Sequence, residues 1–253
     1  TCALPILLHA INDIALSASQ GTEAAMGAAM HLLSYAAPSP GAGAMRGASG
    51  MALAAGSGAA CLVARSRAGG YHYLSDKSGT VFSGPIFTLA KVIKNVMAPA
   101  PEAELGALCM NAKEAAAIRN CLEAMGYPQP PTPAKAGSSA ASGTTSSAMK
   151  QKHSKATGMR FYWLKDRAQQ GQLNIYWGSG KHNLGDYHTK HHPPTHRKQA
   201  RPIYAFAEGA SPEALQGRIE AMAGKTEPRR EGKRSAPSVA PKGFPLAGKL
   251  PLR

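Results

Sequence analysis

Short runs of apolar and small residues recur along the middle of the chain at lengths typical of strands. These runs cover residues 51–55, 71–74, 86–89 and 173–177. The last run alternates apolar and polar side chains, and basic residues and glycines separate the first two runs. We therefore predict a strand over each of these four runs.

Other segments repeat apolar residues at helical spacing. The clearest covers residues 102–125, where acids occupy the first turn and the helix dipole favours them. Thr22 is a suitable N-cap for a helix that ends before Pro38. Further helices are predicted at 154–170, in a short segment capped by Asn183, and at 211–222.

The order of strands and helices predicts a mixed α/β domain over residues 51–192. Residues 136–148 consist almost wholly of Gly, Ala, Ser and Thr, a composition typical of a linker. Residues 193–253 read as a basic tail rich in Pro and Gly, with one short helix and disorder beyond residue 224. Pro193 and Pro194 are expected to end any helix that precedes them.

Positive charge is concentrated in the second part of the chain. Lys and Arg number 29 against 14 Asp and Glu, which gives a formal net charge of +15. Residues 150–253 carry twenty of these bases, seven of the acids and six of the nine His. A local positive field of this kind favours an acidic macromolecule as the partner.

Cysteine spacing and hydropathy indicate the compartment expected for the protein. The four Cys form no C-x-x-C pair, so neither a disulfide framework nor a cysteine-based zinc site is expected, and a reducing intracellular compartment fits best. The longest apolar stretch is about half the roughly 20 residues that a membrane helix needs. Because the chain starts at Thr1 without a basic leader, we expect it to be part of a longer product.

Several common catalytic motifs are absent. The sequence has no G-x-G-x-x-G, no P-loop and no G-x-S-x-G elbow. Four His between 188 and 196 invite a zinc interpretation, but the two prolines interrupt their alignment and only Asp186 lies nearby as a further ligand. A basic surface explains these His better; they are His188, His191, His192 and His196.

Basic residues interleaved with aromatic ones indicate contact with nucleic acid. Cations along a groove bind phosphates at variable spacing, so composition supports contact without specifying a base sequence. The predicted contacts are Arg65, Arg67, Lys150, Lys152, Lys155, Lys181 and Lys190. From these residues alone, a solvated helix face above an aromatic core explains the pattern equally well.

Three blocks of sequence resemble a known family. They are Arg-Ser-Arg-Ala-Gly-Gly-Tyr-His-Tyr-Leu-Ser at 65–75, Glu-Ala-Glu-Leu-Gly-Ala-Leu at 102–108, and Asn-Leu-Gly-Asp-Tyr-His-Thr-Lys-His-His-Pro-Pro at 183–194. In order and spacing they are similar to the ribonuclease H region of Ty1/copia-type retrotransposon polyproteins, over roughly residues 10–205. The resemblance implies a ribonuclease H-like mixed five-stranded sheet with flanking helices. In such a sheet we expect a three-stranded antiparallel start over residues 51–89, a short fourth strand near 132–136 and a fifth strand at 173–177. The resemblance implies RNA/DNA hybrid as a partner. It also implies that residues 1–50 connect the domain to an upstream reverse transcriptase.

The resemblance also assigns four metal-binding positions. In this chain they hold Gly58, Glu104, Gly137 and Asp186, where the family has four acids. The family's hydrolysis of RNA resembles two-metal catalysis, with carboxylates holding two Mg²⁺ ions about 4 Å apart. Glycine supplies no ligand, so the resemblance implies a weak or absent Mg²⁺ site held by Glu104 and Asp186.

Ordinary explanations exist for the two remaining acids. Without the resemblance, each is an exposed acid near the start of a helix, where the dipole stabilises it. Asp76 and Glu102 are the only nearby acids that could replace the missing ones, and their positions at a strand end and on another helical face disfavour both. Because the implied fold brings the four positions together and the pair restores both metal positions, Gly58→Asp and Gly137→Asp together are expected to restore some cleavage, and neither alone.

Three interpretations follow from the sequence. The first is a degenerate ribonuclease H-like domain whose hydrolysis is impaired. The second is a basic nucleic-acid-binding module without catalysis, and the third is a relic of a transposable element without function. The missing carboxylates favour the second and third, and the retained acid pair favours the first.

Overall fold

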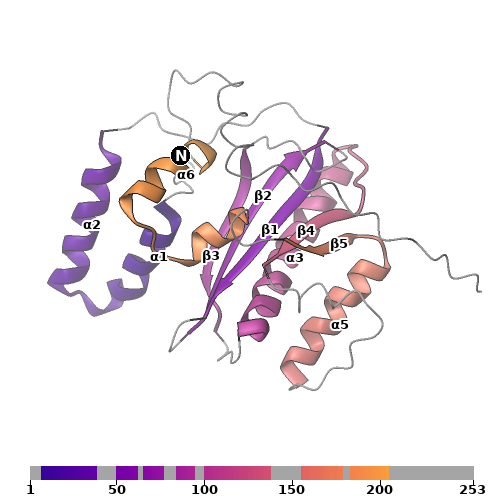
Figure 1. Ribbon diagram of the computed structural model, residues 1–253, viewed down its shortest axis with the longest axis horizontal. Helices are drawn as coiled ribbons and strands as arrows, with labels where there is room; N and C mark the ends of the chain where they lie inside the picture. Colours follow the sequence, from indigo (N-terminus) through magenta and orange to yellow (C-terminus); the bar gives the residue numbers. More distant parts are fainter. Residues whose placement is uncertain are drawn as a thin grey trace, which may run out of the picture.

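A single five-stranded sheet forms the centre of the protein. The computed structural model describes residues 7–38, 50–61, 65–76, 84–94, 100–137, 155–178 and 183–204. The strands are β1 (Ala52–Ala60), β2 (Arg67–Ser75), β3 (Pro85–Val92), β4 (Thr132–Ala136) and β5 (Leu173–Trp177). Their order in the sheet is β3-β2-β1-β4-β5 (Figure 1).

Both kinds of strand pairing occur in this sheet. β1 pairs antiparallel with β2, and β2 antiparallel with β3, whereas β1, β4 and β5 run parallel. The predicted mixed α/β sheet and the bounds of β4 and β5 are confirmed. β1 and β2 are longer than predicted. Their additional residues are mostly Gly, Ser and Ala, which show no alternation of apolar and polar side chains, so the sequence pattern did not reveal them.

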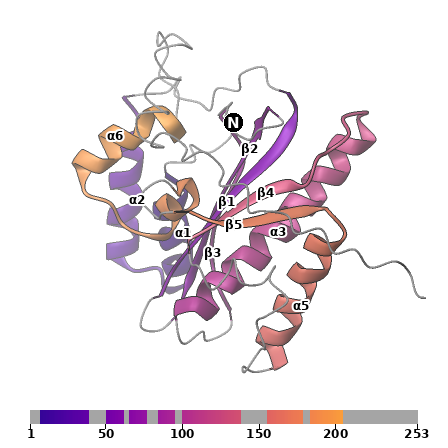
Figure 2. The same cartoon turned by 45° about the vertical axis from the view of Figure 1, so that its right-hand side comes forward.

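Helices cover both faces of the sheet (Figures 1 and 2). On one face lie α3 (Ala100–Ala124) and α5 (Lys155–Gln169). On the other side lie α1 (Leu8–Ser17), α2 (Glu23–Ala36) and α6 (Pro194–Tyr204). The short 3₁₀ helix η2 (Ala18–Gln20) links α1 to α2, and η5 (Leu184–Thr189) packs directly on β1 and β2.

Local sequence signals explain several helix ends. The Thr22 side chain accepts a hydrogen bond from the Ala25 amide at 3.3 Å, which confirms it as the N-cap of α2. Asn183 caps η5 in the same way, through the Gly185 amide at 3.2 Å. Gly171 follows α5 with φ of 72°, a left-handed conformation that glycine adopts without strain.

Two features near the ends of the described chain differ from the sequence prediction. η5 ends at Thr189, ahead of Pro193 and Pro194, as expected, but a helix that was not predicted, α6, begins at Pro194. Proline fits there because the first helical position needs no amide hydrogen. α6 buries Ala200 and Tyr204 against Tyr71 of β2, so the packed unit continues past residue 192. The helix predicted at 211–222, the linker after 137 and the basic tail lie outside the described residues.

The long helix also differs in its start. α3 is one continuous helix from Ala100, two residues earlier than predicted. Glu104 is therefore its fifth residue and stands in the second turn, not the first. Glu104 is therefore not at the exposed end of the helix, and its side chain is half-buried.

A buried polar network joins α3 to the first two strands. The Asn111 side-chain nitrogen donates to the Gly69 carbonyl at 2.9 Å and lies 3.0 Å from the Ser57 hydroxyl. The His72 ring meets the Asn111 carbonyl at 3.1 Å. Asn111 and His72 are both almost completely buried, so this network fixes how α3 sits on β1 and β2.

We predict that Asn111→Ala lowers the free energy of unfolding by about 2 kcal/mol, because it leaves buried partners on β1 and β2 without a donor. Asn120 lies exposed on the same helix, and Asn120→Ala serves as the matched control with a change within about 0.5 kcal/mol. Denaturant unfolding measures both. Equal stabilities of the two variants would contradict a structural role for the network.

Candidate functional site at Glu104 and Asp186

Two glycines lie side by side just past the point where the parallel pairing of β1 with β4 ends. Ser57 of β1 pairs with Ala136 of β4, so the next residues, Gly58 and Gly137, are neighbours across the two strands. Adjacent strands are separated by about 4.8 Å. This edge of the sheet is the frame on which the remaining groups gather.

The two acids stand over these glycines, one over each. A β-carbon placed on Gly58 would lie 2.9 Å from the Asp186 α-carbon, and one on Gly137 would lie 3.3 Å from a Glu104 carboxylate oxygen. The structure thus brings together all four positions that the sequence resemblance singles out. They come from β1, α3, the end of β4 and η5.

Glu104 is the most perturbed acid of the group. Its side chain is half-buried, and its Oε2 atom is buried without a hydrogen-bond partner. The pKa of Glu104 is raised to about 7, mainly by burial and also by the negative charge of Asp186, while a hydrogen bond from the Ala59 backbone and the charge of Lys190 oppose the shift. At neutral pH this carboxyl therefore exchanges a proton readily, unlike an exposed acid at a helix start.

Asp186 is held by polar contacts within and beyond η5. Its Oδ2 atom receives the Lys190 ammonium at 2.6 Å, and the Thr189 hydroxyl lies 3.2 Å from Oδ1. The Asn183 side chain donates to the Ser57 carbonyl at 2.6 Å, which ties the start of η5 to β1. Lys190 thus neutralises the one acid that faces Gly58.

These residues do not fit a two-magnesium centre. Mg²⁺ prefers oxygen ligands in octahedral geometry, and here the donor set is two carboxylates, one of them paired with an ammonium group. The space that a third carboxylate needs at Gly58 is filled by the Asp186 backbone. A side chain at residue 58 meets the backbone of η5, which disfavours the expected rescue at that position, whereas at Gly137 the nearest atoms are the ends of the Glu104 and Asn183 side chains.

The other nearby acids do not replace the missing ones. Asp76 follows Ser75, which pairs with Ala52, so it stands about six strand residues, roughly 20 Å, from the level of Gly58. Glu102 is two residues from Glu104 on α3, which at 100° per residue directs it to nearly the opposite side of the helix. Among the described residues, Glu104 and Asp186 remain the acid pair of the site.

The predicted nucleic-acid contacts have different surroundings. Arg65 is exposed, while the Arg67 guanidinium binds Asp13 and lies against the His9 ring. Lys190 pairs with Asp186. Lys150, Lys152 and Lys181 lie outside the described residues, as does the side chain of Lys155.

A second group of polar residues escaped the sequence analysis. His9 and Asp13 of α1 gather with His191, and their ligand atoms all lie within 4.8 Å of one another, so this group could hold a metal ion. The i, i+4 spacing of His9 and Asp13 was the available signal in the sequence.

One member of the His cluster considered for zinc, His188, is fully buried, and neither of its ring nitrogens has a hydrogen-bond partner. Burial lowers the pKa of His188 to about 3.

Comparison with known proteins assigns no family to the chain. No family model matches it, and no curated protein is similar to it. The resemblance to retrotransposon ribonuclease H therefore rests on the motifs alone. Within the described ranges, every helix is too short or too polar to cross a membrane.

We predict that Glu104→Gln changes how stability depends on pH. Because the pKa of Glu104 is about 7 in the folded protein and 4.5 when exposed, the native protein loses stability as pH rises from about 4.5 to 7. Glutamine stays neutral, so the variant should gain on the native protein by on the order of 1 kcal/mol or more between pH 4 and pH 8. Urea unfolding at both pH values measures this difference.

Glu114→Gln is the control for this experiment, because Glu114 lies on the same helix, is more exposed and makes a long ion pair, 3.9 Å, with Lys91. Its stability relative to the native protein should change little between the two pH values. A parallel pH dependence in the two variants would show that Glu104 is not the buried acid.

We predict that Gly58→Ala and Gly137→Ala have unequal effects. The new β-carbon at residue 58 meets the backbone of Asp186 and should cost about 1–3 kcal/mol of stability. The one at residue 137 meets a movable carboxylate and should cost less than about 1 kcal/mol. Thermal unfolding compares them, and a Gly58→Ala variant as stable as the native protein would contradict the close packing of η5.

Proposed function

We propose that this protein is a degenerate ribonuclease H-like domain of Ty1/copia-type retrotransposon origin, which binds nucleic acid and has lost hydrolysis of RNA in RNA/DNA hybrids. The carrying observation is the meeting of Gly58, Glu104, Gly137 and Asp186 at one edge of the sheet. These four positions are separated by up to 128 residues in the chain, and nothing in their local sequence requires them to meet.

The mixed sheet supports this origin. Three antiparallel strands, a long helix, two further parallel strands and helices on both faces are compatible with a ribonuclease H-like architecture. A fold alone does not establish an activity, so the argument for function depends on the site.

Loss of hydrolysis follows from the chemistry of the site. Two-metal hydrolysis needs several carboxylates to hold two ions and orient the attacking water. Here two positions are glycine, Asp186 is ion-paired with Lys190, and Glu104 is about half-protonated near neutral pH. Each of these features weakens the attraction for a divalent cation.

Retention of nucleic-acid binding rests on charge. The formal net charge is +15, and phosphate binding tolerates variable spacing of cations. Arg65 is exposed among the described residues and free of the ion pairs that engage Arg67 and Lys190. Exposed positive charge beside a site that lacks two of the four carboxylates favours binding the nucleic-acid backbone over cutting it.

We predict that the full chain shows no Mg²⁺-dependent cleavage of an RNA/DNA hybrid, measured with a labelled RNA strand. It should nevertheless bind the hybrid, with affinity that falls steeply between about 50 and 200 mM salt as condensed counterions are displaced. Robust cleavage that Glu104→Gln abolishes would overturn the loss of hydrolysis. Absence of binding to any nucleic acid would overturn the proposal as a whole.

Paired charge variants test which cations bind phosphate. Lys150→Ala with Lys152→Ala removes two predicted contacts. The slope of log affinity against log salt concentration should then fall by about two, one for each lost phosphate contact. Lys91→Ala with Lys94→Ala removes the same charge from exposed positions at the end of β3 and should leave it nearly unchanged. Equal effects of the two pairs would mean that only overall charge matters.

A further inference from the structure

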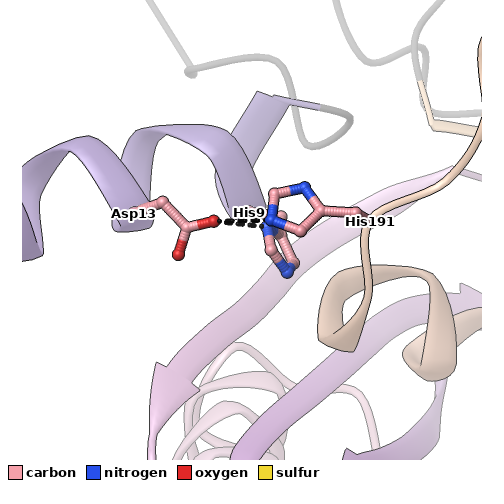
Figure 3. Close-up of side chains that lie close together, drawn as sticks. All are labelled: His9, Asp13 and His191. Atoms are coloured by element: carbon pink, nitrogen blue, oxygen red, sulfur yellow. Dashed lines mark ion pairs between the residues drawn. The ribbon is translucent and has the colours of Figure 1, made fainter. Parts of the chain in front are cut away.

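His9, Asp13 and His191 form a compact group away from the acid pair. His9 and Asp13 lie one turn apart on α1, and His191 follows η5 (Figure 3). The Asp13 Oδ2 atom lies 3.2 Å from His9 Nδ1 and 3.1 Å from His191 Nε2. One carboxylate oxygen thus faces two imidazole nitrogens that come from distant parts of the chain.

These separations match those between ligands of a tetrahedral metal ion. With bonds of about 2.0–2.1 Å to nitrogen and oxygen, neighbouring ligand atoms of tetrahedral zinc lie roughly 3.3 Å apart. The two Asp13 distances fall close to this value, and all three ligand atoms lie within 4.8 Å of one another. Small side-chain rotations therefore suffice to place one ion among the three atoms.

The surroundings orient two of the three ligands. The Arg67 guanidinium binds the other Asp13 oxygen, Oδ1, which leaves Oδ2 directed at the imidazoles. The Thr189 carbonyl accepts a hydrogen bond from the His9 ring. Outer partners of this kind, on the carboxylate and on the histidine, are typical of metal sites, where they fix the direction of each ligand.

The donor set selects the class of ion. Arg67 offsets the charge of Asp13, so the group has little net negative charge to attract Mg²⁺ or Ca²⁺, which also require more oxygen ligands. Two imidazoles and one carboxylate suit zinc and similar transition-metal ions. A fourth position is left for water, because the described residues contribute three ligand atoms.

We propose that His9, Asp13 and His191 bind one zinc ion, which joins α1 to the segment that follows η5. None of the three ligands belongs to the acid pair, and the proposal does not rest on the proposed function. An ion at His191 anchors one end of residues 183–191, which include η5 and Asp186, while Asn183 anchors the other end on β1.

Calorimetric titration of the full chain with ZnCl₂, with Co²⁺ absorption as a second readout, tests this assignment. We expect one ion per chain. His191→Ala and Asp13→Asn should each weaken zinc binding at least tenfold and remove the tetrahedral Co²⁺ bands. The His191 side chain is 73% exposed, and asparagine keeps an oxygen for Arg67, so both variants should keep the native circular dichroism spectrum.

Two further His variants separate this site from the rest of the His-rich segment. His31 is exposed on α2, and His192 stacks on Tyr187 at 4.6 Å; His31→Ala and His192→Ala should bind zinc as the native chain does. Loss of binding in His192→Ala but not in Asp13→Asn would assign the ion to the His-rich segment and overturn the proposal. Absence of stoichiometric binding by the native chain, or equal weak binding by every variant, would overturn it as well.

Discussion

The close packing of η5 on the first two strands is the constraint on which the rest of the structure depends. A β-carbon on Gly69 would lie 2.3 Å from the Gly185 carbonyl, and one on Gly185 would lie 2.6 Å from the Gly56 carbonyl. Backbone therefore rests directly on backbone at this contact, which only glycine permits. The contact sets the height of η5 above the sheet and thus the position of every side chain that η5 carries.

The same constraint determines what the acid pair can do. With η5 so close to the sheet, Asp186 lies against Gly58, and burial of Glu104, with a smaller contribution from the Asp186 charge, raises the pKa of Glu104 to about 7. A third carboxylate at residue 58 has no space, because the Asp186 backbone occupies it. The volume that a metal-binding side chain at residue 58 needs is therefore filled by the backbone of η5.

η5 and the residues after it also connect two regions that differ in chemistry. Asp186 faces the sheet edge with Glu104, whereas His191, five residues later, faces α1. The first region combines oxygen donors with a neutralising lysine, and the second combines imidazoles with a carboxylate that an arginine orients. One short segment thus carries groups suited to different ligands, and its anchoring by Asn183 and by Tyr204, whose hydroxyl donates to the Leu184 carbonyl at 2.7 Å, serves both.

Local rules account for what the sequence determined by itself. The bounds of β5, the Thr22 and Asn183 caps and the end of α5 shortly before Gly171 all follow from patterns within a few residues, since alternation, capping and left-handed glycine act over that range. The strand β4 was expected from the motif resemblance instead. The motif resemblance indicated which four positions to compare. Only the tertiary structure decided that Glu104 is half-buried, that η5 fills the space at Gly58 and that His9 and Asp13 meet His191. Burial and contacts between distant segments depend on how the helices pack on the sheet, and no local pattern encodes that packing.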